Sequence, residues 1–211
     1  TTAASYANAG LEGVGAYTDA EGLYPADGTT CGNLDAPYAY EQVSYVDYAE
    51  GIYIGYKWYE TADAEGYWSN VSNEYGTGYD GVVQYPFGYG LSYTTFEYSD
   101  LKVAPEKTDM KQPVAVTVTV KNTGKVRGTE VVQLYVRDLV ASVTRPTRQL
   151  KGFERVTLEP GESREVSFTI TSDAVGFYRQ DMSFGYEPGD FKVWAGGSSD
   201  AALEGSFEIT K

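Results

Sequence analysis

The second half of the chain alternates apolar and polar residues with a period of two, which restricts it to extended strands. Its clearest run places Val114, Val116, Val118 and Val120 at every other position. Successive side chains of a β-strand point to opposite faces, so this spacing puts all four valines on one buried face. The turn residues Asn122-Thr123-Gly124 follow directly. The segment therefore predicts a half-buried strand that ends in a tight turn.

Similar strands follow at regular spacing. We expect strands at about residues 96–103 and 150–158, and inward-facing apolar positions at Val132, Leu134 and Val136, at Val166, Phe168 and Ile170, at Phe191, Val193 and Ala195, and at Phe207 and Ile209. Gln133 and Tyr135 fall on the opposite face of their strand. Turns are expected at 159–162 and 187–190. Seven to eight short strands with such turns predict a mainly β fold, an antiparallel sandwich of immunoglobulin or fibronectin type III kind.

The first half has a different composition. Residues 1–100 contain 15 Asp and Glu but a single Lys, Lys57, so they carry the whole net charge of −14. They also contain 17 of the 20 Tyr, whereas residues 101–211 balance 15 acidic with 15 basic side chains. We place domain boundaries accordingly: an incomplete, acidic, Tyr-rich segment at 1–84, a linker at 85–96 and the sandwich at 97–211.

Residues 1–45 show no sustained period, which predicts irregular structure. The run DYAEGIYIGYKWYE at 47–60 is ambiguous, because its apolar residues fit two patterns. A helical stripe would use Ile52, Tyr53, Tyr56 and Tyr59. A strand face would use Ile52, Ile54, Tyr56 and Trp58. We favour a helix. Residues 1–84 have too few aliphatic side chains for a core of their own, so we expect them to be completed by other protein and to be disordered alone, whereas 93–211 should unfold cooperatively.

Composition excludes several kinds of function. The acidic balance argues against nucleic acid and against an anionic membrane, which both attract Lys and Arg. No run reaches the ~18 apolar residues of a membrane span. Histidine is absent and Cys31 is the single Cys, which excludes His-based metal sites, Ser–His or Cys–His nucleophiles and an internal disulfide. We expect no cofactor and no metal. The missing initiating Met leads us to expect a piece of a longer protein.

Three blocks of sequence resemble the C-terminal end of family 3 glycoside hydrolases, the β-glucosidase group. EGIYIGYKWYE at 50–60 is similar to the end of that family's α/β sandwich domain. YPFGYGLSYTTF at 85–96 is similar to the linker that follows. EVVQLYVRDLVASVTRPTRQLKGFERV at 130–156, with EPGDFKVWAGGS at 187–198, is similar to its fibronectin type III-like domain. The resemblance covers about residues 45–211.

The resemblance implies a retaining β-glycosidase, which needs two carboxyl groups about 5–5.5 Å apart. In the family's order, the Asp nucleophile and the Glu acid/base both precede residue 50, so no catalytic residue is expected in this chain. In that family the nucleophile usually lies in a Ser-Asp-Trp motif, and the most similar string in this sequence is Ser99-Asp100-Leu101. The implied partners are the N-terminal catalytic domains of the same enzyme, in one chain or a cleaved one, and the parent's substrate, a β-linked oligosaccharide or glycoside.

Two segments are predicted to dock on those domains. In the linker, proline fixes φ and glycine permits positive φ or close approach. The predicted docking residues there are Pro86, Phe87, Gly88, Tyr89, Gly90 and Leu91. The long loop VASVTRPTR at 140–148 is the second segment. We expect its Arg145 and Arg148 to meet carboxylates of the neighbouring domains.

Exposed aromatic side chains could instead stack on sugar rings. Tyr67 and Trp68 are the candidates for substrate contact, because they lie in a Gly-flanked loop just before the linker. Packing against the missing domains is the favoured alternative. Two other functions stay open: a non-catalytic carbohydrate-binding module and a structural interaction module. The acidic, Cys-poor composition favours an extracellular or cell-surface location in a bacterium, with the cytoplasm as the alternative.

Overall fold

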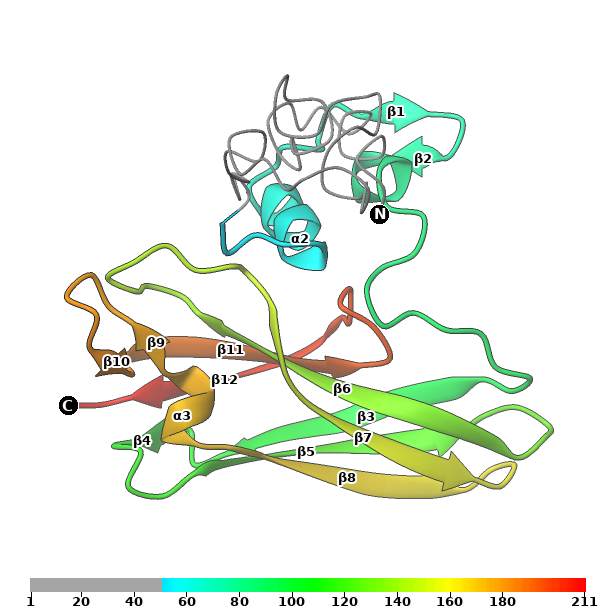
Figure 1. The fold of residues 1–211 in the computed structure, drawn as a ribbon. Helices are drawn as coiled ribbons and strands as arrows, with labels where there is room; N and C mark the ends of the chain where they lie inside the picture. Colours follow the sequence, from blue (N-terminus) through cyan, green and yellow to red (C-terminus); the bar gives the residue numbers. More distant parts are fainter. Residues whose placement is uncertain (1–50) are drawn as a thin grey trace, which may run out of the picture. The chain divides into compact units, whose positions relative to one another are not determined.

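The alternating strands fold into two sheets that pack face to face (Figure 1). The computed structural model describes residues 51–211. One sheet has the order β3-β5-β8, with β3 at Phe96–Ala104, β5 at Val114–Asn122 and β8 at Ser163–Ile170. The other has the order β4-β12-β11-β6-β7, with β4 at Lys107–Thr108, β12 at Leu203–Ile209, β11 at Gly189–Gly196, β6 at Gly128–Asp138 and β7 at Gln149–Leu158. Neighbouring strands are antiparallel, apart from β4 and β12. The predicted antiparallel sandwich is confirmed.

The core lies between the two sheets and is aliphatic. Val114, Val116, Val118 and Val120 of β5 are all fully buried. They pack in one cluster with the inward residues of β6, β8, β11 and β12. The period of two therefore identified the inner faces of β5, β6, β8, β11 and β12 correctly, because burial of alternate apolar side chains is what holds two sheets together.

The middle of the outer face of β6 is buried as well, which the alternation did not predict. Gln133 and Tyr135 are 4% and 0% exposed. Tyr135 belongs to a second, smaller cluster with Trp194 and Ala201, onto which Tyr56 packs. A face of the five-stranded sheet that would otherwise meet water is thus covered by the segment before the sandwich.

That segment contains α2 (Tyr56–Ala64), the short strands β1 (Ser72–Asn73) and β2 (Gly76–Thr77), and the 3-10 helix η3 (Gly78–Gly81). The favoured helix is confirmed for Tyr56 and Tyr59, while Ile52 and Tyr53 precede it. Tyr56–Lys211 form one compact unit that includes both α2 and the sandwich. This unit begins earlier than the predicted boundary at residue 85. The expectation for residues 1–45 lies outside the described residues.

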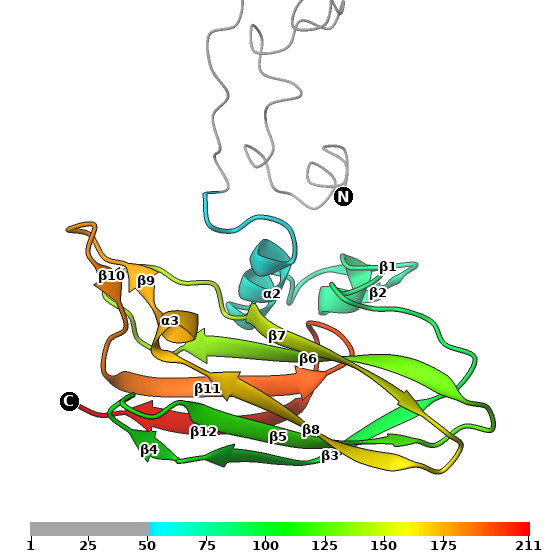
Figure 2. The same ribbon diagram turned by 60° about the horizontal axis from the view of Figure 1, so that its bottom comes forward.

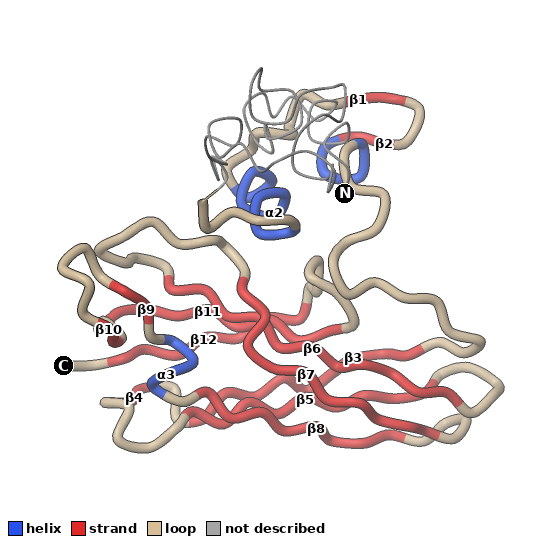
Figure 3. Tube along the Cα trace, in the orientation of Figure 1, coloured by secondary structure: helices blue, strands red, loops and turns tan. Residues whose placement is uncertain are grey.

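Short elements follow β8 at one end of the sandwich. α3 (Ser172–Val175) is followed by a small hairpin of β9 (Phe177–Tyr178) and β10 (Phe184–Gly185), which stands beside the loop between β6 and β7 (Figure 2). Strands dominate the described chain, and helix is confined to three short pieces within it (Figure 3). Among residues 51–211, no helix has the length and apolar character needed to cross a bilayer.

Candidate interdomain interface

α2 packs on the outer face of the five-stranded sheet through Tyr56. The Tyr56 ring stacks on Phe87 of the linker, with centroids 4.4 Å apart and planes at 16°. It also meets Tyr135 of β6 edge-on at 6.1 Å. Its hydroxyl accepts a 2.9 Å hydrogen bond from the backbone N–H of Leu150 in β7. One aromatic side chain thus joins the helix, the linker and two strands.

The linker is fixed to the sheet by a tight turn at Gly88. The N–H of Tyr89 donates to the Pro86 carbonyl at 3.1 Å, and Gly88 has φ +84°, the geometry that favours glycine at the third position of a type II turn. Gln133 Nε2 donates to the Gly88 carbonyl at 3.2 Å. A Cβ on Gly88 would overlap the Gln133 side-chain amide. The glycine therefore allows both the turn and the close approach to β6.

A buried carboxylate connects α2 to the loop between β11 and β12. Glu60, the last residue of the EGIYIGYKWYE block, is 7% exposed. Its Oε1 accepts hydrogen bonds from the hydroxyl of Tyr79 at 2.8 Å and from Ser199 Oγ. The N–H of Ser199 in turn donates to the Phe87 carbonyl at 2.8 Å. Burial raises the pKa of the Glu60 carboxyl group, although these donors oppose the shift.

Arg148 secures the same loop from the other side. Its guanidinium donates to the backbone carbonyls of Ser199 and Ala201. It also lies over the Trp194 ring, 4.5 Å from the centroid, in a cation–π contact. Arg145 donates to Gln149 Oε1 at 2.9 Å and lies 4.9 Å from the centre of the Phe177 ring. The structure thus places both arginines against this chain's own residues, and their predicted contacts with neighbouring carboxylates stay a prediction.

Of the other predicted docking residues of the linker, Pro86 is half-buried, and Tyr89, Gly90 and Leu91 are exposed. Tyr89 and Leu91 are 48% and 89% exposed. Tyr85 and Tyr89 stack on each other at 5.2 Å, and Gly90 has open space around the position of a Cβ. Phe87 is itself 45% exposed, but its ring stacks on Tyr56 and its carbonyl accepts from the N–H of Ser199, whereas the exposed rings of Tyr85 and Tyr89 stack on each other.

The two substrate candidates occupy different environments. Trp68 is only 2% exposed, and its indole N–H donates to the Tyr59 carbonyl at 3.3 Å. A ring this deeply buried does not stack on a sugar in this conformation. Tyr67 is 55% exposed and meets Trp68 edge-on at 4.8 Å. Of the pair, Tyr67 has the accessible ring.

Sequence reasoning missed Glu60, Gln133 and Ser199, which carry much of this interface. Glu60 lies four residues after Tyr56, so both fall on one face of α2, and an acidic residue at the end of an aromatic stripe was the available signal. Gln133 looked like an ordinary outward residue of a strand. In the described part of the chain, no three His, Cys, Asp or Glu side chains gather closely enough to hold a metal ion. The arrangement is chemically suited to holding segments together.

Comparison with known proteins agrees with this architecture. Residues 130–199 match the fibronectin type III-like domain family. The periplasmic beta-glucosidase of Salmonella typhimurium is 48% identical over 125 residues, which are 59% of this chain and 16% of the relative. Thermostable beta-glucosidase B of Acetivibrio thermocellus is 40% identical over 166 residues, 78% of this chain and 20% of the relative.

A solved structure shows the same likeness. The family 3 beta-glucosidase of Bifidobacterium adolescentis superposes with a TM-score of 0.64 at 37% identity, over 78% of this chain and 22% of that protein. The chain thus spans only about a fifth of the length of these relatives, and it matches their C-terminal region. The chain therefore matches the C-terminal region of family 3 beta-glucosidases, and residues 130–199 of its sandwich match the fibronectin type III-like domain family.

Proposed function

We propose that this chain is the C-terminal part of a retaining β-glycosidase that hydrolyses terminal β-linked sugars. In this proposal the chain braces the catalytic domains and shapes the rim of the active site, while the nucleophile and the acid/base belong to the preceding part of the enzyme. The partner is that part, in one chain or a cleaved one. The match to the C-terminal fifth of β-glucosidases supports this assignment.

The observation that carries the proposal is the buried polar tie between α2 and the sandwich. Glu60, Ser199 and Arg148 come from three separate segments and hold α2, the linker and the β11–β12 loop in one arrangement. By the resemblance, α2 ends the α/β sandwich domain that carries the acid/base. A sandwich fixed to α2 would therefore fix the position of that domain, and errors of about 1 Å in such positioning cost on the order of 100-fold in rate.

The exposed apolar residues of the linker support the proposal that this chain packs against the catalytic domains. Tyr85, Tyr89, Leu91 and Tyr93 are 63%, 48%, 89% and 101% exposed. Clustered apolar surface of this kind marks protein interfaces more often than free surface. These four residues follow one another along the linker, where the resemblance expects the catalytic domains to pack.

A chimera tests the proposal. The matching C-terminal region of the Acetivibrio thermocellus enzyme is replaced by this chain, and hydrolysis of an aryl β-glucoside is measured. We expect the chimera to be active and the isolated chain to be inactive. The relative truncated before this region should lose activity by on the order of 10-fold or more, because its catalytic domains lose their support. A truncated relative as active as the intact enzyme would show that the region does not brace the catalytic domains.

Glycan binding by the isolated chain is a second candidate function, favoured by the exposed rings of Tyr67 and Tyr75, which are 55% and 78% exposed. Pull-down on insoluble β-glucan, compared between the wild type and Tyr67→Ala, tests it. Retention that depends on Tyr67 would support a carbohydrate-binding module. If neither protein is retained on the β-glucan, the bracing role stays the proposed function.

We infer that the enzyme acts outside the cytoplasm of a bacterium. One relative is named a periplasmic beta-glucosidase, and the acidic, Cys-poor composition of this chain suits that setting. Fractionation of the source cells, followed by an immunoblot against the sandwich, tests this location. Recovery in the cytosolic fraction would overturn it.

A further inference from the structure

The β9–β10 hairpin exposes a group of apolar side chains at one end of the sandwich. Tyr178 and Phe184 face each other across its two strands, with ring centroids 5.1 Å apart, and they are 63% and 50% exposed. Met182, in the turn between the strands, is 74% exposed. We call these three residues the hairpin surface. Apolar side chains that gather on a surface mark interfaces more often than free surface.

Met182 has an unusual backbone conformation. Its N–H donates to the Arg179 carbonyl at 2.9 Å, and the N–H of Arg179 donates to the Ser183 carbonyl at 2.9 Å, which closes a tight turn. Met182 has φ +66°, in the left-handed region where hairpin turns favour Gly or Asn. Residues held in this region are strained and gather at functional sites. Since most of its side chain is exposed, Met182 does not offset this strain by burial within the described part of the chain.

Arg179 holds the hairpin in one arrangement. Its guanidinium donates to Glu187 Oε1 at 3.1 Å, to the Ser183 hydroxyl at 3.2 Å and to the Tyr186 carbonyl at 2.6 Å. Glu187 also accepts hydrogen bonds from the N–H and the hydroxyl of Ser142, in the loop between β6 and β7, at 2.9 and 2.6 Å. A surface that is ordered before binding loses less entropy when a partner docks. The network therefore prepares the hairpin surface for binding.

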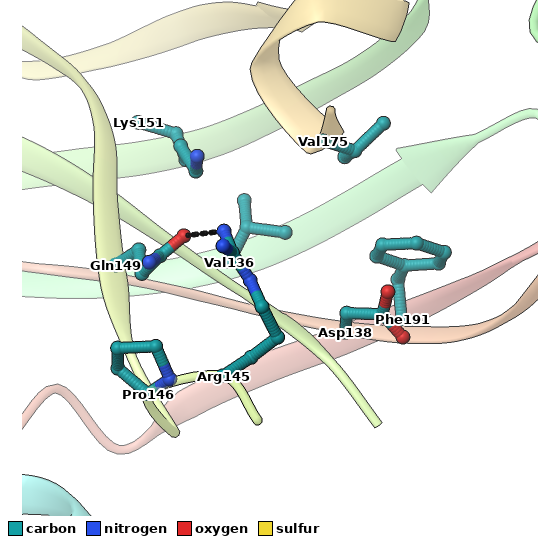
Figure 4. Close-up of a pocket in the computed structure, with 8 residues that line it drawn as sticks. All are labelled: Val136, Asp138, Arg145, Pro146, Gln149, Lys151, Val175 and Phe191. Carbon is teal, nitrogen blue, oxygen red and sulfur yellow. Dashed lines mark hydrogen bonds between the residues drawn. The ribbon is translucent and has the colours of Figure 1, made fainter. Parts of the chain in front are cut away.

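The loop between β6 and β7 connects the hairpin to the interface around α2. At its far end, the N–H of Thr147 donates to the Thr61 hydroxyl of α2 at 3.1 Å. Between the two ends, Arg145 lies over the ring of Phe177, the first residue of β9, and donates to Gln149, as the dashed line in Figure 4 shows. The cavity beside Arg145 is about 10 Å³, room for about one water. Arg145 thus supports the hairpin from within this chain.

We propose that the hairpin surface docks on the catalytic part of the enzyme. This inference rests on the proposed function and adds a second contact to that of the linker. Two observations favour this occupant. The loop makes the hairpin continuous with the interface that holds α2, and the matched region is only 20% of one relative and 22% of another, so most of the enzyme lies outside it.

The chemistry of the hairpin surface indicates an apolar partner surface. Tyr178, Met182 and Phe184 carry no charge, although the whole chain has a net charge of −14. The centre of a protein interface is enriched in aromatic residues and Met and depleted in charged residues. The matching patch on the catalytic part should therefore be an apolar depression that takes the Met182 side chain.

Oxidation of Met182 by dilute hydrogen peroxide tests the contact. The sequence has two Met, and Met110 is 8% exposed, so it is an internal reference that should react slowly in every sample. Mass spectrometry compares the isolated 211-residue chain with the active chimera. We expect Met182 to react about tenfold more slowly in the chimera, because docking removes its sulfur from solvent. An equal rate in an active chimera would overturn the inference and leave the proposed function intact.

The variant Met182→Gly separates docking from folding. In the isolated chain it should leave the midpoint of urea denaturation about unchanged, because relief of the left-handed strain offsets the greater freedom of glycine in the unfolded chain. In the chimera it should shorten the half-life of activity at elevated temperature roughly fivefold, because a buried apolar contact is lost. Val126→Ser is the matched control, since Val126 is 45% exposed in the turn at the opposite end of β6. Equal half-lives of the two variants would contradict docking.

Other occupants give different results in the same oxidation experiment. Protection of Met182 in the isolated chain at high protein concentration would indicate a second copy, and protection by soluble β-glucan oligosaccharides would indicate a sugar. Either result, together with an unprotected Met182 in the active chimera, would overturn the inference. An inactive chimera would contradict the proposed function, and the rate at Met182 in that protein would still decide whether the catalytic part covers the hairpin.

Discussion

Gly88 shows how one residue can decide whether the linker lies against the sandwich. Its φ of +84° belongs to the left-handed region, and a Cβ there would meet the Gln133 amide. Gly88→Ala should therefore lower the free energy of unfolding by about 1–3 kcal/mol. Gly90→Ala is the matched control, because nothing lies near its Cβ position, and its effect should stay within about 0.5 kcal/mol. Urea denaturation measures both, and equal effects would contradict the account of Gly88.

Glu60 gives the interface a pH dependence with a definite sign. Burial raises its pKa, so folding favours the protonated carboxyl group. Its contribution to stability is therefore present below the ordinary carboxyl pKa and is lost as the pH rises through the raised value. Gln in its place keeps an acceptor oxygen for Ser199 and Tyr79 but has no charge to bury.

The variant Glu60→Gln should therefore gain stability relative to the wild type as the pH rises from about 4 to about 7. Urea denaturation of both proteins across this range measures the difference, in which all other titrating groups cancel. If instead the free energy of unfolding of the wild type rose relative to that of the variant with increasing pH, the Arg148 charge would outweigh the desolvation of Glu60.

At the scale of elements, α2 and the linker act as the cover of a sheet. Tyr56 of α2 packs against the cluster of Tyr135, Trp194 and Ala201 on the outer face of that sheet. A chain that begins at residue 93 should still unfold cooperatively, since the core between the sheets is intact. Its free energy of unfolding should be roughly 2–4 kcal/mol below that of a chain beginning at residue 56, given the apolar surface uncovered.

Trp194 offers a direct check, because it is the one Trp after residue 93 in the sequence. Its emission in the shorter chain should shift to longer wavelength, because its cluster loses the cover of Tyr56 while Arg148 stays over its ring. A blue, buried emission spectrum together with unchanged stability would contradict the covering role.

Elements also differ in how far the sequence determines them. The valines of β5 and the inner residues of β6 were predictable, because burial on one face leaves a period of two. The burial of Gln133 and Tyr135 was not, since it depends on a helix about 75 residues earlier in the chain. The start of α2 at Tyr56 was also hidden, because the aromatic run fits both periods. Glu60 and Ser199 meet only through the tertiary fold.

For the whole molecule, the first half is expected to depend on other protein. A fragment of residues 1–84 would lack Ser199, Tyr135 and Leu150, which pair with Glu60 and Tyr56 in the complete chain. We predict that this fragment is digested rapidly by trace protease and shows no cooperative transition in urea. A resistant 1–84 fragment with a sharp transition would contradict the proposal that its core is supplied from elsewhere.

The tie between Glu60 and Ser199 bears on how such enzymes can be recombined. A gene fusion that exchanges the sandwich at the linker would take Glu60 from one parent enzyme and the residue at the Ser199 position from another. Crossover points placed ahead of Tyr56 keep the bond within one parent. Shuffled libraries should therefore yield more soluble offspring from the earlier junction than from the linker.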